Sequence, residues 1–143
     1  MAIKQITVFV ENKQGALVSI TDILAKSNIN LRALSIAETN DFGILRLIVN
    51  DVETAKKALS DNGYLIKVTD VVGVKIGDAP GKLTAALSVL DKSGINMEYL
   101  YAFMARTEKH AYVVLRVEEN EAAEAALTGA GFKMISEADI CKL

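Results

Sequence analysis

An internal repeat constrains the fold of this 143-residue chain more than any other feature. A shift of 66 residues places Gly15 on Gly81, and the same shift lays AKSNINLRAL (25–34) over DKSGINMEYL (91–100). Self-similarity over such a length is typical of a duplicated structural unit. The sequence therefore predicts two copies of one small fold rather than a single mid-sized domain.

The match continues through the rest of each copy, with two additional residues in the second. A shift of 68 lays NDVETAKKALSDNGY (50–64) over EENEAAEAALTGAGF (118–132). The extra residues fall where a hairpin turn would tolerate them. We expect the first domain to span residues 1–69 and the second residues 70–143, with almost no linker at the boundary.

Each copy shows the order strand, helix, strand, strand, helix, strand. Residues 5–10 alternate apolar and polar side chains, as a strand with one buried face does. Residues 16–27 place leucine and isoleucine along one helical stripe, and residues 52–62 form a second helical pattern that stops at Gly63. Glycine and asparagine at the helix ends suit the left-handed conformation that terminates many helices. Two such helices cover one face of an antiparallel sheet, which predicts an α+β protein of two ferredoxin-like βαββαβ units.

Composition limits the class of protein. The chain has a net charge of −2, a hydrophobic fraction of 51% and a single cysteine. It lacks the concentrated basic surface that nucleic-acid binding needs. No run approaches the ~20 apolar residues of a membrane span, and the N-terminus does not follow the layout of a signal peptide. We therefore expect a cytoplasmic protein with neither nucleic-acid nor membrane partners and without an internal disulfide.

No group of residues predicts catalysis. His110 is the only histidine and falls in a predicted solvated hairpin turn, so a histidine-based triad or a zinc site would lack its partners. Cys141 is expected to fill an apolar position on the last strand. The segment GDAPGKL (77–83) resembles a phosphate-binding loop, but its glycine spacing is one residue short and Leu83 replaces the Mg²⁺-binding Ser or Thr. We expect no enzyme activity, no cofactor and no metal site.

Three aromatic residues, Tyr99, Tyr101 and Phe103, share one face of the second strand in the second copy. Their counterparts in the first copy are alanine or serine, and the alternation places them on the sheet face without helices. RNA-recognition modules also carry aromatic residues on an open sheet, but on other strands and among basic neighbours. We therefore favour burial of this face against another domain or subunit.

The turn between the first strand and the first helix is the most informative motif. It reads DAPGKL (78–83) in the second copy and NKQGAL (12–17) in the first. This turn resembles the Asp-x-Pro-Gly-x-Leu turn of the ACT-domain family. The duplication, the order of elements and the segments SNIN and SGIN also resemble that family. The resemblance covers nearly the whole chain and is greatest to stand-alone tandem ACT proteins. It implies a non-catalytic regulatory protein that senses a small amino acid.

The chemistry of the turn supports an α-amino acid as the ligand. Proline before the helix fixes φ and needs no backbone donor, and glycine lets the backbone approach a ligand. The amides of residues 81–83 are expected to be unpaired at the positive end of the helix dipole, where they would bind a carboxylate. Asp78 would bind the ammonium group. The alternative is a tight turn in which Asp78 caps the helix and no ligand binds.

The resemblance also implies where the ligand lies. Ligands of this family usually lie between two units, so the facing wall is expected from the start of a second strand. The expected ligand-binding residues are Asp78, Pro80, Gly81, Lys82, Leu83 and Asn96 in the second copy and Asn12, Gln14, Gly15, Ala16, Leu17 and Asn30 in the first. The expected partners are a small amino acid, a second copy of the chain in a homodimer and an enzyme of amino-acid metabolism. The alternative function is a ligand-free structural or regulatory subunit that acts through protein–protein contacts.

Overall fold

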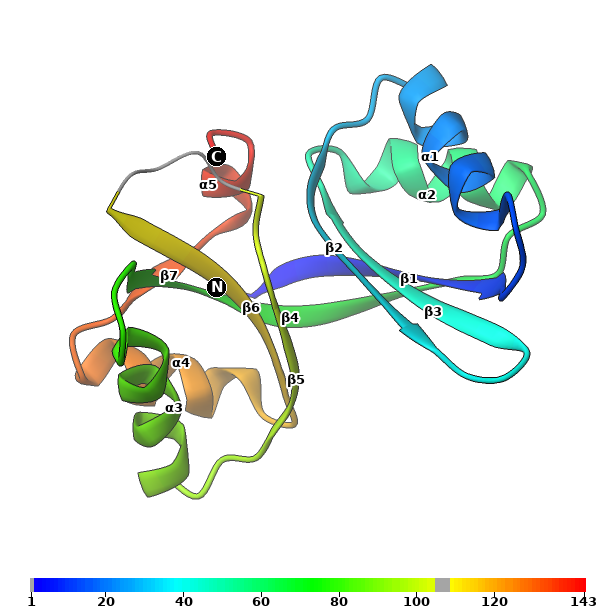
Figure 1. The fold of residues 1–143 in the computed structure, drawn as a ribbon. Helices are drawn as coiled ribbons and strands as arrows, with labels where there is room; N and C mark the ends of the chain where they lie inside the picture. Colours follow the sequence, from blue (N-terminus) through cyan, green and yellow to red (C-terminus); the bar gives the residue numbers. More distant parts are fainter. Residues whose placement is uncertain (1, 105–108) are drawn as a thin grey trace. The chain divides into compact units, whose positions relative to one another are not determined.

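The computed structural model describes residues 2–104 and 109–143. The chain divides into two compact units, one formed by Lys4–Thr69 and the other by Asp70–Leu143 together with the first residues of the chain through Ile3 (Figure 1). Strand β4 (Ile66–Gly77) runs through the boundary between them without a break. It therefore supplies the last strand of the first unit and the first strand of the second.

The first unit has the order of elements that the repeat predicts. The elements are β1 (Ile3–Glu11), α1 (Ala16–Lys26), β2 (Leu31–Glu38), β3 (Phe42–Val49), α2 (Val52–Asp61) and the start of β4. The strands lie in the order β2-β3-β1-β4, and β3 pairs antiparallel with both of its neighbours. Both helices cover the same face of the sheet (Figure 1).

The second unit repeats this arrangement and adds one short helix. After β4 come α3 (Lys82–Lys92), β5 (Met97–Ala102), β6 (His110–Val117), α4 (Asn120–Gly129), β7 (Lys133–Ile135) and α5 (Glu137–Ile140). The strands lie in the order β5-β6-β4-β7, and all three pairings are antiparallel. The predicted fold class, two ferredoxin-like βαββαβ units, is confirmed. Helix α5, which begins with a capping box between Ser136 and Asp139, was not predicted.

The duplication is also visible in the backbone conformation. The second strand of each unit, β2 or β5, has a register shift near its first residue. Three pairs of equivalent residues have positive φ. The pairs are Gly15 (84°) and Gly81 (87°), Asn28 (59°) and Gly94 (71°), and Gly63 (83°) and Gly131 (93°). Left-handed residues are thus found just after each of the four long helices, as the sequence predicts, and also just before α1 and α3.

Each unit buries one side of its sheet beneath its own two helices. In the first unit, Ile6 and Val8 of β1 belong to the same buried cluster as Leu24 of α1. In the second, Val74 of β4 and Leu90 of α3 belong to a separate cluster. These residues carry the period-2 and helical patterns of the sequence, so hydrophobic burial explains the element assignment directly.

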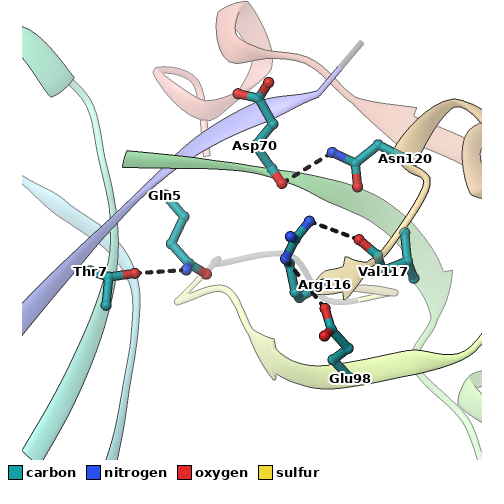
Figure 2. A network of polar contacts seen from close by, with 7 residues as sticks. All are labelled: Gln5, Thr7, Asp70, Glu98, Arg116, Val117 and Asn120. Atoms are coloured by element: carbon teal, nitrogen blue, oxygen red, sulfur yellow. Dashed lines mark hydrogen bonds and ion pairs between the residues drawn. The ribbon is translucent and has the colours of Figure 1, made fainter. Parts of the chain in front are cut away.

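Polar contacts within the second unit connect α4 to β4 and β6 to β5. Asn120, at the start of α4, donates a hydrogen bond from Nδ2 to the carbonyl oxygen of Asp70 at 3.0 Å (Figure 2). The Nε atom of Arg116 lies 3.4 Å from the Oε2 atom of Glu98 on β5, and its Nη1 donates to the carbonyl oxygen of Val117 at 2.8 Å. The first contact ties the beginning of α4 to the strand that both units share.

Two residues lie elsewhere than the sequence analysis expected. Cys141 is exposed and follows α5, because β7 ends at Ile135 and the chain then turns into that helix. The prediction that it fills an apolar position on a strand is therefore wrong. His110 is exposed, but it is the first residue of β6 and pairs with Gly77, so its assignment to the turn is also wrong. Residues 105–108 of that turn lie outside the described residues.

The aromatic residues of β5, and Phe103 just after it, were predicted on the sheet face without helices, and Tyr101 lies there. Tyr101 pairs with Val114, whereas its neighbour Leu100 pairs with the core residue Leu115 beneath the helices. Tyr101 and Phe103 are buried, and the rings of Tyr99 and Tyr101 are stacked with centroids 6.5 Å apart. Burial of two large aromatic side chains contributes substantially to stability. The nature of the surface that covers this face in solution stays a prediction.

Candidate functional site

The turn between β4 and α3 holds most of the predicted ligand-binding residues of the second copy. Its first backbone amide, that of Asp78, donates to the carbonyl oxygen of Lys109 at 3.2 Å, which fixes the turn to the start of β6. Gly81 then adopts φ 87°, and α3 begins at the next residue. An added Cβ at Gly81 would meet no atom within 4 Å, so glycine is needed here for its conformation and not for lack of space.

The helix amides are only partly available for a ligand. The amide of Lys82 donates to the carbonyl oxygen of Ala79 at 3.2 Å, so the expectation that it is unpaired is wrong. A tight turn before the helix satisfies this donor locally. Within residues 2–104 and 109–143, the amides of Gly81 and Leu83 make no hydrogen bond. Two donors at the positive end of the α3 dipole therefore remain for an anionic group.

The carboxylate of Asp78 does not cap α3. The N-cap residue is Gly81, and this cap has no side-chain hydrogen bond. The Asp78 side chain is exposed and has no hydrogen bond or ion pair among the described residues. The alternative in which Asp78 caps the helix is therefore not observed. Its carboxylate is available to a cationic group.

The first copy has the same backbone but different side-chain contacts. Gly15 has φ 84°, and the amide of Ala16 donates to the carbonyl oxygen of Lys13 at 3.3 Å. Asn12 differs from Asp78 because its Nδ2 donates to the carbonyl oxygen of Thr39, 3.3 Å away at the end of the β2–β3 hairpin. The side chain that replaces the aspartate is thus partly committed to the protein itself.

A pocket of about 620 Å³ adjoins the turn of the first copy. Gln14, Gly15 and Ala16 line it on one side. Large apolar side chains form much of the rest of its wall, namely Phe9, Phe42, Tyr64 and Leu65. Leu17 lines a second, smaller hollow toward β2 and β3. The turn residues of this pocket were predicted from the motif, but its aromatic wall, which comes from three other segments, was not.

Asn30 and Asn96 lie far from the turns of their own units. In the first unit, β3 pairs with the end of β1 at Phe42 and with the start of β2 at Val49. Seven residues of extended strand separate these positions, which corresponds to about 24 Å. Met97 and Gly77 pair with opposite ends of β6 in the same way. Neither asparagine can therefore contact a ligand bound at the turn of its own unit.

Among the described residues there is no group of three histidine, cysteine, aspartate or glutamate side chains that could hold a metal ion. No helix in this described part of the chain is long and apolar enough to cross a membrane.

Comparison with known proteins agrees with this architecture. A family model described as an ACT domain pair matches residues 1–143. The chain belongs to this family. The resemblance drawn from the turn motif and the duplication is thus confirmed, and the ACT domain pair accounts for both copies.

Solved structures include similar proteins. Protein BT0572 from Bacteroides thetaiotaomicron is 42% identical with a TM-score of 0.93, and the match covers 100% of this chain and 98% of that one. The ligand-free regulatory subunit of aspartate kinase from Thermus thermophilus is 19% identical with a TM-score of 0.67, over 90% and 91% of the two chains. At that identity the likeness shows a common fold. No match was found among the curated proteins.

Proposed function

We propose that this ACT domain pair is a non-catalytic sensor that binds a small amino acid and modulates a partner protein. The turn of the second copy carries the proposal, because the available carboxylate of Asp78 lies in the same short turn as the unpaired amides of Gly81 and Leu83. An α-amino acid presents an ammonium group and a carboxylate on adjacent atoms. One acceptor and two donors in one turn match these two groups.

The second copy is proposed as the stronger site. Asp78 offers a full negative charge to an ammonium group, and charge-assisted hydrogen bonds are roughly twice as strong as neutral ones. Asn12 offers only an amide dipole, and its Nδ2 already donates to Thr39. Binding at the turn of the first copy would therefore be weaker, with Gln14, Gly15, Ala16 and Leu17 as its surroundings.

We propose that the site is completed by a second unit. Asn30 and Asn96 lie about 24 Å from the turns of their own units along the sheet, so either one would have to reach a ligand from a different unit. A homodimer in the cytoplasm would supply such a unit. Since regulatory subunits of aspartate kinase share this fold, an enzyme of amino-acid metabolism is the class of partner we propose.

A thermal-shift panel of the common amino acids tests the proposal. A ligand at 100 times its Kd stabilises the folded chain by about 2.7 kcal/mol. At roughly 2–4 °C per kcal/mol for a chain of about this size, Tm should rise by about 5–10 °C. One amino acid or a small related group should give this rise. A panel without any rise would contradict amino-acid sensing and favour a ligand-free subunit that acts through protein contacts.

A further inference from the structure

The helix-free faces of the two units differ in charge at equivalent positions. In the first unit, the amide of Phe9 on β1 donates a hydrogen bond of 3.2 Å to the carbonyl oxygen of Leu65, the residue just before β4, and both have exposed apolar side chains. Their counterparts in the second unit are Lys75 of β4 and Lys133 of β7, which are paired in the antiparallel register. One duplicated backbone thus presents an apolar pair in one copy and two cations in the other.

Two lysines in this arrangement repel each other. Directly opposed residues on antiparallel strands have Cβ atoms about 4.5–5.5 Å apart, and like charges there are destabilising. Among residues 2–104 and 109–143, neither Lys75 nor Lys133 forms an ion pair with a carboxylate. Asp139 lies near Lys133, but its Oδ2 accepts hydrogen bonds of 2.9 Å from both the amide and the hydroxyl of Ser136. The repulsion is therefore not neutralised by an intramolecular ion pair in the described part of the chain.

A third lysine reaches the same region of the sheet. Lys82 is the first residue of α3, yet its Cγ, Cδ and Cε atoms would lie 3.0–3.2 Å from a Cβ built on Gly77. Gly77 is two residues from Lys75 on the same strand, so a Cβ at Gly77 would point to the same face of the sheet as the Lys75 side chain. The missing side chain of Gly77 leaves the room in which the stem of Lys82 lies. In the first copy this strand position is Glu11, which pairs with Lys13 at 3.0 Å.

The surrounding groups leave this cluster positively charged. His110 pairs with Gly77 across β4 and β6, and Tyr112, which carries a hydroxyl group, pairs with Lys75. Asp78 follows Gly77 and contributes one opposing charge at the start of the turn. Asp139, near Lys133, contributes a second. Three ammonium groups on β4, β7 and α3 exceed these two carboxylates, so an anionic ligand with several oxygen atoms would complement them.

We propose that Lys75, Lys82 and Lys133 form a binding site for a small dianion, a phosphate or a dicarboxylate, on the second unit of this protein. Each lysine would donate to an anionic oxygen, and the bound anion would screen the repulsion between the two sheet lysines. The site does not depend on amino-acid sensing, because its ligand needs no ammonium group. It gives the second unit a chemistry that the first unit lacks.

Calorimetric titration of the full chain with inorganic phosphate, and separately with succinate, tests this site. Neither anion carries an ammonium group for Asp78, so a failure here is distinct from a failure of amino-acid binding. Ionic strength is held constant with sodium chloride. Saturable binding of phosphate alone identifies a phosphoryl group as the preferred dianion, and binding of succinate identifies a dicarboxylate. Saturable binding of neither would overturn the proposal.

The matched double variant, Lys75→Phe with Lys133→Leu, replaces both sheet lysines by the residues at the equivalent positions of the first copy, Phe9 and Leu65. It should weaken binding of the anion about tenfold or more, and Lys82→Met alone should weaken it several-fold without touching the sheet pair. Lys56→Met, at an exposed site on α2 of the first unit, should bind as the parent does. Parent-like affinity in Lys82→Met and in a folded double variant would also overturn the proposal.

Discussion

Replacing Asp78 by alanine isolates the one charged group that the amino-acid proposal requires. The exposed carboxylate has no hydrogen bond or ion pair among the described residues and does not cap α3. Its removal should therefore leave folding stability nearly unchanged. If it holds the ligand's ammonium group, the loss is that of one charge-assisted hydrogen bond, about 1.5–3 kcal/mol. This corresponds to a Kd increased on the order of ten- to a hundredfold.

The assay is calorimetric titration of parent and variant with whichever amino acid stabilises the chain in the thermal panel. Asn12→Ala is the matched control, because it makes the equivalent truncation in the first copy. That variant removes the hydrogen bond from Asn12 to Thr39, so it should cost about 0.5–1.5 kcal/mol of stability. Its effect on affinity should be smaller than that of Asp78→Ala. Asp78→Ala should thus act mainly on affinity, and Asn12→Ala mainly on folding stability.

An unchanged Kd in Asp78→Ala would refute the assignment. The turn would then be a structural connection whose aspartate binds nothing. A loss of affinity that comes with an equally large loss of stability would also contradict the argument, because it would mean that the carboxylate supports the fold. Melting curves of both variants without ligand separate these results.

Three further predictions concern stability and assembly. Gly81→Ala and Gly15→Ala should each cost about 1–2 kcal/mol in denaturant unfolding, because both positions have positive φ but open space around an added Cβ; equal stability would show that the turn can relax. Hydrogen bonds from the Thr54 hydroxyl and amide lower the pKa of Asp51, so its contribution is full above the ordinary aspartate pKa and is lost as pH falls through the lowered value. Asp51→Ala should accordingly lower Tm at pH 7, and the difference from the parent should shrink on acidification; a constant difference would contradict the assignment. Tyr101→Lys places a charge at a buried position and should lower Tm or reduce the mass in light scattering, whereas no change in either would contradict a role of this side chain in packing or assembly.

Local patterns predicted every element of both units except α5. The helices α1 and α2 begin where the sequence places them and end within one residue of the predicted positions. Asn28 and Gly94 adopt the left-handed conformation expected after a helix. These features depend on residues close together in the chain, since periodicity and capping act over a few residues. The addition of α5 was missed because its capping box follows a strand of only three residues.

The candidate site was predicted only in part. The glycine, the acidic residue and the start of the helix were found from the motif, but the state of each donor was not. The amide of Lys82 is used within the turn, and only the backbone geometry around Ala79 reveals it. The aromatic wall of the first pocket was missed because Phe42 and Tyr64 come from segments far from the motif.

The sequence by itself determined that the protein is a tandem repeat of a βαββαβ unit with a glycine turn before each first helix. Tertiary structure alone decided which side chains of the two copies are available. Asn12 is held by Thr39 from a hairpin 27 residues away, whereas Asp78 has no such partner among the described residues. Lys75 and Lys133 become neighbours only through the register of β4 with β7. Helix and strand propensity is a local property, but electrostatics depends on distance in space, which the chain acquires only when its strands pair.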